Sequence, residues 1–475
     1  MMWLLLSVLA AFAAVVAFRA WRFRPAPHQR AQAEPLEVDE AAVGERLRAM
    51  VRLPTVSDRD PQRMDAEAFE RFRALLKAQY PGVGAACSWE SAGRNGLMIR
   101  WPGRGQAAPS VLMAHYDVVP ADAAEWDEPP FEGVVRDGEL WGRGTLDTKC
   151  TVLGILEAAE ALIRRGFAPA GDVYLAFGGD EECMGGDAAA IVDELERRGV
   201  RPAFVLDEGG AIVDHVFPGV SQSAALVGVA EKGSAFVDLT AAGKSGHASA
   251  PPARQSAAVL ARALERIRRK PFPFTLSGPA RALFDTLGHY APFSLRLVFA
   301  NLWCFAPALG LLCRLSGGEL NALVRTTCAV TRLSGSEAYN VLPGQCRAGL
   351  NARIICGETV DGVRDRLQRV VGPDTAVSVV QGHDPSPVSP ACGEAWERVS
   401  QAIREVYPDV IVAPYLMLAC SDSRHYGRLC PNVYRFSGMP LSKAQREMIH
   451  GANERVPLAL LPDLVRFFAS VMSKC

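Results

Sequence analysis

The sequence has no C-x-x-C pair, and its 12 cysteines are scattered singly without regular spacing. This pattern gives no sign of a disulfide framework and mildly favours a reducing compartment. Charge of one sign is not in excess either, since 51 Lys and Arg balance 52 Asp and Glu to a formal net charge of −1. We therefore expect no nucleic-acid partner. Internal repeats and low-complexity blocks are also missing, which excludes a repeat architecture.

The amino terminus does carry a long apolar run. Residues 1–18 are uncharged, and Arg19, Arg22 and Arg24 follow at once. A spanning helix needs about 20 apolar residues, whereas a cleaved signal peptide carries its positive charge before the apolar run. We expect residues 1–24 to form a retained single-pass membrane anchor, with a cleaved signal peptide as the alternative. The arginines favour a cytoplasmic body by the positive-inside rule, and the sequence leaves the membrane side open.

The length of 475 residues exceeds one compact core, so we expect at least two domains. Apolar strand-like runs alternate with helical patterns, as in an α/β sheet covered by helices on both faces. The pattern of strand-like and helix-like segments changes in the middle of the chain. This change predicts an inserted, smaller α+β domain of one sheet and two helices. The predicted parts are an anchor over 1–24, a linker over 25–38, a main domain over 39–227 and 382–475, and the insert over 228–381.

One segment of the insert is unusually apolar. Residues 297–315, LVFANLWCFAPALGLLCRL, are almost uncharged but are interrupted by Pro307 and Gly310. A second membrane span is disfavoured because it would split the insert across the bilayer. A core helix and a membrane-surface or acyl-chain-binding hairpin both stay open for this segment.

The stretch VYLAFGGDEECMGG organises the rest of the chain. Residues 173–177 predict a buried strand, and Asp180, Glu181 and Glu182 follow at the carboxyl end, where α/β sheets place their chemistry. Adjacent carboxylates repel one another unless a cation or shared protons neutralise them. The alternative is an acidic first turn of the next helix, with Asp187 as its N-cap.

Other apolar runs also end in potential metal ligands. They supply His115 and Asp117 in HYDVVP, Asp207 and Glu208 in LDEGG, Asp147 in WGRGTLDTKC and His450 in HGANER. Each has an ordinary structural alternative, such as a hydrogen-bonded core histidine or a helix cap. Their joint occurrence argues against coincidence. Nitrogen and oxygen donors without cysteine suit zinc, and also cobalt or manganese.

These motifs resemble the zinc-dependent exopeptidase family of aminoacylase, carboxypeptidase S and carboxypeptidase G. Further matching motifs are GGDEECMGG, EKG, SGHASAPP, NVLPGQ and NARI, and the EKG, SDSRHYG and YRFSG details are closest to the carboxypeptidase S and N-acyl-amino-acid hydrolase branch. The resemblance implies an α/β metallopeptidase fold, with a mixed-sheet catalytic domain and the insert as a lid or dimerisation domain. A homodimer formed through the insert is a family habit that we carry over as an expectation.

The resemblance also implies roles for individual residues. It makes two Zn²⁺ ions per chain the expected cofactor, held by His115, Asp147, Glu182, Asp207 and His450, with Asp147 bridging. Three further residues have catalytic roles: Glu181 as the general base, Asp117 as the acid that orients His115, and His247 as the oxyanion donor. Asn340 and Arg353 are the expected ligands of the substrate carboxylate.

The implied function is hydrolysis of an amide next to a free carboxylate. The substrate is either a short peptide, as for a carboxypeptidase, or an N-acyl amino acid. The alternative is an inactive metal-binding membrane protein that uses the same fold for interaction. Thr148 stands where many members of the family have a second acid. The length and apolar character of residues 270–318 leave the substrate size open.

Overall fold

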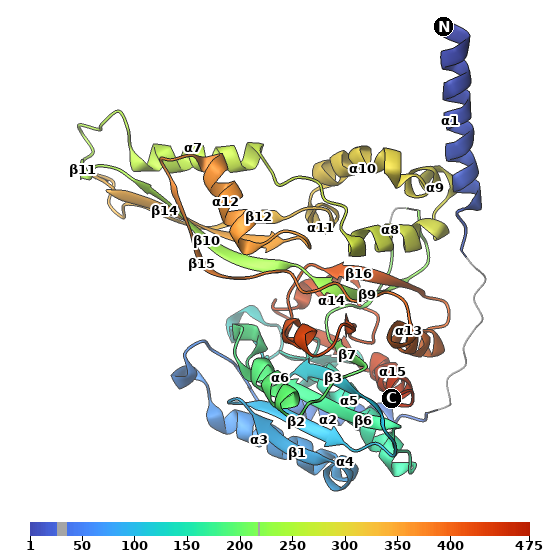
Figure 1. Cartoon of the computed structure of the whole chain (residues 1–475). Coiled ribbons are helices and arrows are strands. Elements are labelled where there is room, and N and C mark those ends of the chain that lie inside the picture. The colour runs from blue at the N-terminus through green and yellow to red at the C-terminus, as the bar shows by residue number, and fades with distance from the viewer. Residues whose placement is uncertain (26–35, 217–218) are drawn as a thin grey trace.

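The computed structural model describes residues 1–25, 36–216 and 219–475 of the chain. Figure 1 shows a lower body built on one large sheet, a smaller sheet that extends from its upper part, and a first helix that projects away from both. Residues 26–35 of the predicted linker lie outside the described residues.

The helices agree with the expected pattern where their caps are clear in the sequence. Asp39 and Asp65 accept hydrogen bonds from the amides of Ala42 and Ala68, and so begin the first two helices of the body. The helices are α1 (Met2–Arg22), α2 (Glu40–Val51), α3 (Ala66–Gln79), α4 (Pro81–Ala86), α5 (Lys149–Arg164), α6 (Asp187–Arg197), α7 (Ser256–Arg269), α8 (Gly278–Tyr290), α9 (Phe293–Phe299), α10 (Leu302–Ser316), α11 (Gly318–Leu323), α12 (Val360–Val371), α13 (Glu394–Val406), α14 (Lys443–Met448) and α15 (Leu461–Met472).

The large sheet has nine strands in the order β1-β2-β6-β3-β7-β17-β9-β16, with β8 paired to β9. Its central strands β6, β3, β7 and β17 are parallel, whereas β1, β2 and β8 pair antiparallel with their neighbours. The sheet is therefore mixed, as the fold prediction requires. Its strands are β1 (Ser88–Ala92), β2 (Gly96–Trp101), β3 (Ala107–His115), β6 (Gly171–Gly178), β7 (Phe204–Asp207), β8 (Ile212–Val213), β9 (Ala224–Glu231), β16 (Ile411–Met417) and β17 (Val433–Arg435).

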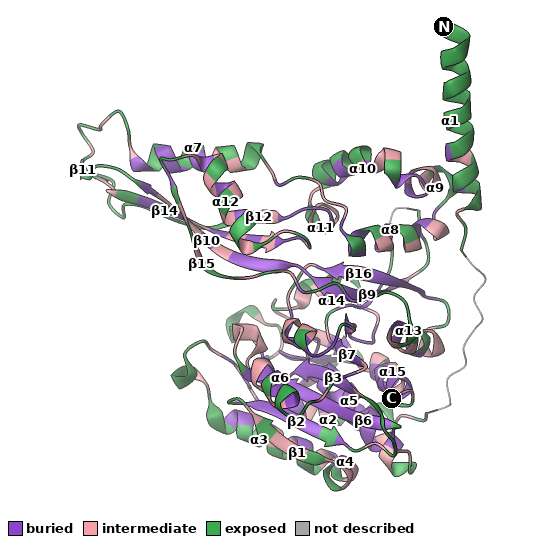
Figure 2. Cartoon of the chain, in the orientation of Figure 1, coloured by how far each residue is buried: buried purple, intermediate pink, exposed green. Residues whose placement is uncertain are grey.

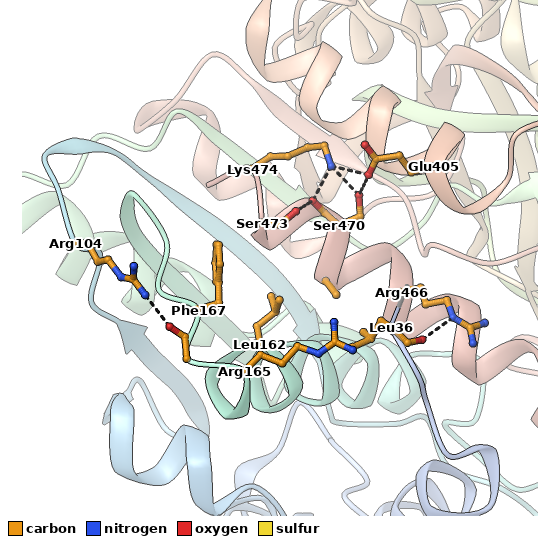
Figure 3. Close-up of a pocket in the computed structure, with 12 residues that line it drawn as sticks. Leu36, Arg104, Leu162, Arg165, Phe167, Glu405, Arg466, Ser470, Ser473 and Lys474 are labelled. Atoms are coloured by element: carbon orange, nitrogen blue, oxygen red, sulfur yellow. Dashed lines mark hydrogen bonds and ion pairs between the residues drawn. The ribbon is translucent and has the colours of Figure 1, made fainter. Parts of the chain in front are cut away.

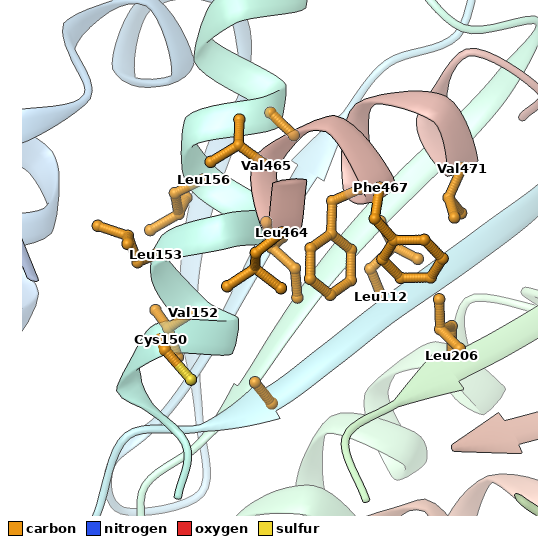
Figure 4. Packing of buried hydrophobic residues seen from close by; sticks show 14 of the residues in the cluster. Leu112, Cys150, Val152, Leu153, Leu156, Leu206, Leu464, Val465, Phe467 and Val471 are labelled. Carbon is orange, nitrogen blue, oxygen red and sulfur yellow. The ribbon is translucent and has the colours of Figure 1, made fainter. Parts of the chain in front are cut away.

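The pleat of the central strands separates two apolar layers. On β3, Leu112 and Ala114 join the cluster that contains α2, α5 and α15, whereas Val111 and Met113 join the cluster on the α6 side. Figure 4 shows side chains of α5 and α15 packed together above β3 and β7. Helices thus cover both faces of the sheet, as predicted, and its central strands are largely buried (Figure 2).

The smaller sheet comprises four antiparallel strands in the order β12-β14-β10-β15. Its apolar face packs against α7 and α12, which agrees with the expected insert of one sheet and two helices. The strands are β10 (Gly233–Ala242), β12 (Thr327–Ser334), β14 (Gln345–Ile354) and β15 (Ala376–His383), and the short pair β11 (Gly246–His247) and β13 (Val341–Leu342) lies at its tip.

Helices α8 to α11 do not belong to the core of that smaller sheet. Leu283, Phe284 and Leu287 of α8 pack with residues of β9 and β16 at the edge of the large sheet. The apolar segment of the insert therefore covers the large sheet. The large sheet also includes β9 as far as Glu231, while the exact domain boundaries stay predictions.

Candidate metal centre

Three parallel strands deliver polar groups to the same sheet edge. Strand β3 ends at His115, β6 ends at Gly178 just before the 3₁₀ turn η3 (Glu181–Cys183), and β7 ends at Asp207. Because these neighbours run in the same direction, their carboxyl ends meet. This is the crevice that open α/β sheets use for binding and catalysis.

The Asp147 carboxylate lies between two histidines. Its Oδ1 is 3.0 Å from His115 Nε2, and its Oδ2 is 3.0 Å from His450 Nε2. The same His450 nitrogen is 2.9 Å from Glu182 Oε2. One oxygen of Asp147 thus faces a ligand set with His115, and the other oxygen faces a set with Glu182 and His450.

The donor set suits a divalent cation. Ligand atoms of His115, Asp147 and Glu182 all lie within 4.8 Å of one another. The second Glu182 oxygen, Oε1, is buried and has no hydrogen-bond partner in the described structure. Imidazole nitrogens and carboxylate oxygens in this proximity match the ligands of zinc. These residues can therefore hold a metal ion.

Asp117 is the hub that orients this edge, since its two oxygens collect donors from three segments. Oδ1 lies 3.3 Å from His115 Nδ1 and accepts from the Glu181 amide at 3.2 Å. Oδ2 accepts from Ser57 Oγ at 2.7 Å and from the Glu182 amide at 3.1 Å. His115 Nδ1 also lies 3.0 Å from the Asp117 backbone oxygen, so Asp117 orients the imidazole through its backbone as well as its carboxylate, and the carboxylate fixes the acidic turn.

The Glu181 carboxylate lies beside the cluster and, unlike that of Glu182, has no described contact with His450. Burial raises the pKa of Glu181 well above its usual value; the charge on His115 opposes this shift, and Asp422 and Glu208 reinforce it. Asp422 is itself buried, with both oxygens unpaired among the described hydrogen bonds. Its approach needs the glycine at the end of β6, because a Cβ on Gly178 would lie 2.7 Å from Asp422 Oδ2.

Asp207 and Glu208 face different surroundings. Asp207 Oδ2 accepts from the Ser423 amide at 3.1 Å, in the 3₁₀ turn η4 (Asp422–Arg428). Burial raises the pKa of Glu208 well above its ordinary value, and the next contributions come from Asp147 and Asp207. No described contact joins Asp207 or Glu208 to the histidines, so the described contacts favour neither acid over the other as a ligand.

Arg143 and Glu454 clamp the two loops that carry Asp147 and His450. Glu454 Oε1 accepts from the amides of Leu146 at 2.7 Å and Asp147 at 3.1 Å, and Oε2 is 2.8 Å from Arg143 Nη1. Arg143 Nη2 in turn donates to the backbone oxygen of His450 at 3.3 Å. Both clamp side chains are almost fully buried. A rigid connection thus spans two segments more than 300 residues apart.

Asp180 and Asp187 have structural surroundings instead. Asp180 accepts from the amides of Gly186 at 2.8 Å and Asp187 at 3.1 Å, at the start of α6. Asp187 is the first helical residue, not the N-cap, and accepts from the Arg94 amide at 2.7 Å. The helix-capping alternative therefore describes Asp180, while Glu181 and Glu182 turn toward the cluster.

The remaining predicted site residues belong to the insert. His247 is exposed at its tip, where Nδ1 lies 2.8 Å from Ser249 Oγ, and the adjacent Asn340 accepts from the Ala248 amide through its backbone oxygen at 2.9 Å. In Figure 1 this tip at β11 lies far to the side of β3 and β6. Within the described chain, neither residue contacts the metal ligands.

Arg353 of β14 does reach the catalytic body. Its Nη1 donates to Cys420 Sγ at 3.2 Å. Burial raises the pKa of the Cys420 thiol to about 11, and among the weaker influences Arg353 lowers the pKa and Glu181 raises it. The Arg353 guanidinium therefore contacts the segment just before the η4 turn that carries Asp422.

A buried polar network that the sequence analysis did not predict supports this region. Glu231 Oε1 accepts from Arg435 Nε at 2.6 Å, from Ser421 Oγ at 2.9 Å and from Ser423 Oγ at 2.7 Å. These residues belong to the EKG, SDSRHYG and YRFSG motifs. The motifs were the feature of the sequence from which the network could have been predicted. The network fixes the η4 turn that carries Asp422 and bonds Asp207.

A separate cavity of about 650 Å³ lies between the end of α5 and α15 (Figure 3). Its polar groups are paired with one another: Lys474 Nζ donates to Glu405 at 2.7 Å, Arg104 to the Gly166 oxygen at 2.7 Å, and Arg466 to the Leu36 oxygen at 3.1 Å. None of its lining residues belongs to the metal cluster. The cavity therefore lies outside the candidate site.

Known proteins share this architecture and sequence. The family model of peptidase family M20/M25/M40 matches residues 111–474. The N-fatty-acyl-amino acid synthase/hydrolase PM20D1 of Xenopus tropicalis is 36% identical over 92% of this chain and 87% of its own length. The probable carboxypeptidase S-like 2 of Dictyostelium discoideum is 32% identical over 91% and 84% of the two chains. The M20 family metallo-carboxypeptidase Sso-CP2 of Sulfolobus solfataricus has the same fold, with a TM-score of 0.68, 16% identity and coverage of 92% and 99%.

Proposed function

The chain belongs to peptidase family M20/M25/M40, a family of metal-dependent hydrolases, and on this premise we propose that it is a dinuclear zinc hydrolase of N-acyl amino acids. The observation that carries the proposal is the position of the Asp147 carboxylate between two histidines, with His115 at one oxygen and His450 at the other. Such a carboxylate has the arrangement of a bridge between two ions.

The proposed ligands form two groups around this bridge. His115 and Asp147 would hold the first ion, and Glu182, His450 and Asp147 would hold the second. The first ion needs another carboxylate. Asp207 is the residue expected from the motif to supply it, and its neighbour Glu208 is the other acid at the end of β7. When bound, two zinc ions would polarise the scissile carbonyl and make a water molecule acidic.

The residues of the chain then handle the protons. Glu181 takes one proton from the attacking water and passes it to the leaving nitrogen, so that the amide C–N bond breaks and a carboxylic acid and an amine are released. In the metal-free structure burial raises the pKa of Glu181 well above its usual value. Asp117 holds the His115 imidazole and the Glu181 amide in position relative to each other.

Substrate recognition is assigned to the insert. Arg353 carries a planar guanidinium suited to the free carboxylate of the substrate, and it lies against Cys420 on the catalytic side. His247 is the proposed donor to the oxyanion. Its exposed position at the insert tip supports action on the site of a partner subunit in a homodimer, together with the adjacent Asn340.

Two observations favour N-acyl amino acids over peptides. The relative from Xenopus tropicalis is named for N-fatty-acyl amino acids, and the segment α8 to α10 adds an apolar surface that a dipeptide does not need. A carboxypeptidase acting on short peptides is the second candidate, supported by the carboxypeptidase S-like relative. An inactive binding protein is disfavoured because Glu181 and the ligand cluster are intact.

The amino-terminal helix is proposed as the anchor of this enzyme. Among the described residues, α1 is the one single helix long and apolar enough to cross a membrane, and a signal sequence would have the same properties. Nearly all of its residues are exposed (Figure 2). Mass determination of the purified mature chain separates the two, since an anchor is retained and a signal peptide is removed.

The proposal is tested with the zinc-loaded protein on a panel of fatty-acyl amino acids and dipeptides. We expect release of fatty acid and amino acid from the first group. Normal metal content with no turnover of either group would overturn the assignment as a hydrolase, and turnover of dipeptides alone would select the second candidate.

A further inference from the structure

The elbow between α9 and α10 is joined to the amino-terminal helix by directed hydrogen bonds. Arg19 donates through Nε and Nη2 to the Ala300 oxygen at 3.1 and 3.0 Å. Asn301 Nδ2 donates to the Val16 oxygen at 3.1 Å, and Val16 and Ala20 are the buried residues of α1. These contacts fix the orientation of α1 relative to α10.

The contact continues further along α1. The rings of Phe12 and Trp303 lie 5.9 Å apart in an edge-to-face arrangement. Phe12 precedes Arg19 by two helical turns, which corresponds to about 10 Å along the helix axis. Trp303, at the start of α10, is therefore level with a purely apolar part of α1. Figure 1 shows α10 extending sideways from the lower part of α1, which continues beyond it.

The exposed face of α10 is apolar. Trp303, Leu311, Leu312 and Leu315 are 60%, 58%, 59% and 77% exposed, whereas Leu309 and Cys313 point into the core. Residues 303, 307, 311 and 315 recur every four positions, so they share one side of the helix with the Trp303 ring. Arg314 is the one charged residue of α10. A water-exposed helix carries charged residues on such a face.

We propose, building on the anchor of the proposed function, that α10 lies in the interfacial region of the bilayer that α1 crosses. The lipid bilayer is the occupant of this face because the face is continuous with α1, and because α1 fixes its depth. With Arg19 and Arg22 at the headgroups, Trp303 reaches about 10 Å toward the hydrocarbon, as interfacial helices do. The bend of 104° between α9 and α10 excludes a straight span by this pair.

Helix α10 is also held by contacts other than those with α1. Helix α11 directly follows α10, and its Glu319 is 3.2 Å from Arg446 of α14. Arg325, which follows α11, donates to the Gly310 oxygen of α10 at 3.0 Å and to the Phe272 oxygen at 3.1 Å. The neighbouring segments therefore fix the position of α10 together with α1.

The test uses the full chain in vesicles of phosphatidylcholine with about 30% phosphatidylglycerol, a mimic of an anionic leaflet. The fluorescence of Trp303 is obtained as the difference between wild type and Trp303→Phe. We expect acyl chains brominated near the glycerol end to reduce this difference at least about twofold, and aqueous iodide to leave it unchanged. The matched control is Trp89→Phe, since Trp89 is half-buried on β1 of the body. Bromolipid should leave the Trp89 difference signal unchanged.

Flotation of the vesicles separates the two proposals. If the chain floats but bromolipid does not quench Trp303, the anchor is retained and the interfacial position of α10 is refuted. Protection of Trp303 from both quenchers would indicate that protein, such as a second copy, covers this face, and also overturns it. A chain that does not float at all refutes the anchor and this inference together.

Discussion

The Glu454 carboxylate and the Arg143 guanidinium form a buried ion pair, with Oε2 2.8 Å from Nη1. Glu454 also accepts hydrogen bonds from the amides of Leu146 and Asp147, and Arg143 donates to the backbone oxygens of His450 and Gly451. The pair contributes no ligand of its own. Its position implies that metal affinity depends on residues that do not touch the metal.

We predict that Glu454→Gln lowers zinc affinity by about 10- to 100-fold, because its amide nitrogen would face the N–H groups of the Asp147 loop. Competition with a chromophoric chelator measures this change. The matched control is Glu139→Gln, which removes a half-buried ion pair with Arg455 at 2.8 Å and touches neither ligand loop. Equal zinc affinities for the two variants would assign Glu454 a role in stability alone.

Glu181→Gln is expected to lower turnover by about a thousandfold and to leave the zinc content unchanged, because the amide cannot accept the proton of the water. Activity and metal content are measured on the same preparation. Asp180→Asn is the control, since this neighbouring acid bonds to amides of α6. Loss of zinc from Glu181→Gln would mean that Glu181 and Glu182 have exchanged roles.

The third carboxylate of the first ion can be assigned by metal content. We expect Asp207→Asn to reduce bound zinc from about two ions to one per chain, and Glu208→Gln to retain both, since Asp207 is the ligand expected from the motif. The reverse result would assign the ligand role to Glu208.

His450 links pH to the stability of the metal-free protein. Side-chain bonds to Asp147 and Glu182 raise the pKa of His450 to about 10. The charged imidazole therefore stabilises the fold fully below its unfolded pKa of about 6.5, and this contribution is lost as pH rises through about 10. We expect the Tm difference between wild type and His450→Gln, measured in chelator, to shrink by a few degrees from pH 6 to pH 10. A constant difference would contradict this pairing.

The partner role of His247 can be tested by mixing subunits. Chains with Glu181→Gln and chains with His247→Ala are each expected to be inactive. Equal mixtures after subunit exchange should regain about a quarter of wild-type activity if the insert tip of one subunit completes the site of the other. No recovery from a mixture that forms mixed dimers would limit His247 to its own chain.

The sequence predicted those features that depend on local pattern. Buried strands that end in His115 and Asp207 follow from apolar runs, and their parallel pairing brings those ends together. The sequence could not determine side-chain direction, so the choice of Asp207 over its neighbour Glu208 rested on the resemblance to the family alone. The direction depends on Ser423, more than 200 residues away.

The partners of buried charges were equally hidden. Arg143 and Glu454 are far apart in sequence, and no periodicity connects them. The apolar segment of the insert was also ambiguous, because the same residues suit a core helix and a membrane surface. In the structure one side of this helix is buried, with Leu309 and Cys313, and another side is exposed, with Leu311 and Leu315.

The central claim is hydrolysis of an amide beside a free carboxylate by the site around Asp147. Its most direct test is kcat/KM of the zinc-loaded enzyme for an N-fatty-acyl amino acid and for the matched substrate whose carboxylate is converted to an uncharged carboxamide. We predict release of fatty acid from the first substrate and a loss of about 100-fold or more for the second, since the charge-assisted bonds of Arg353 are lost. Equal rates for both substrates, or no hydrolysis of either by enzyme with full metal content, would contradict the account.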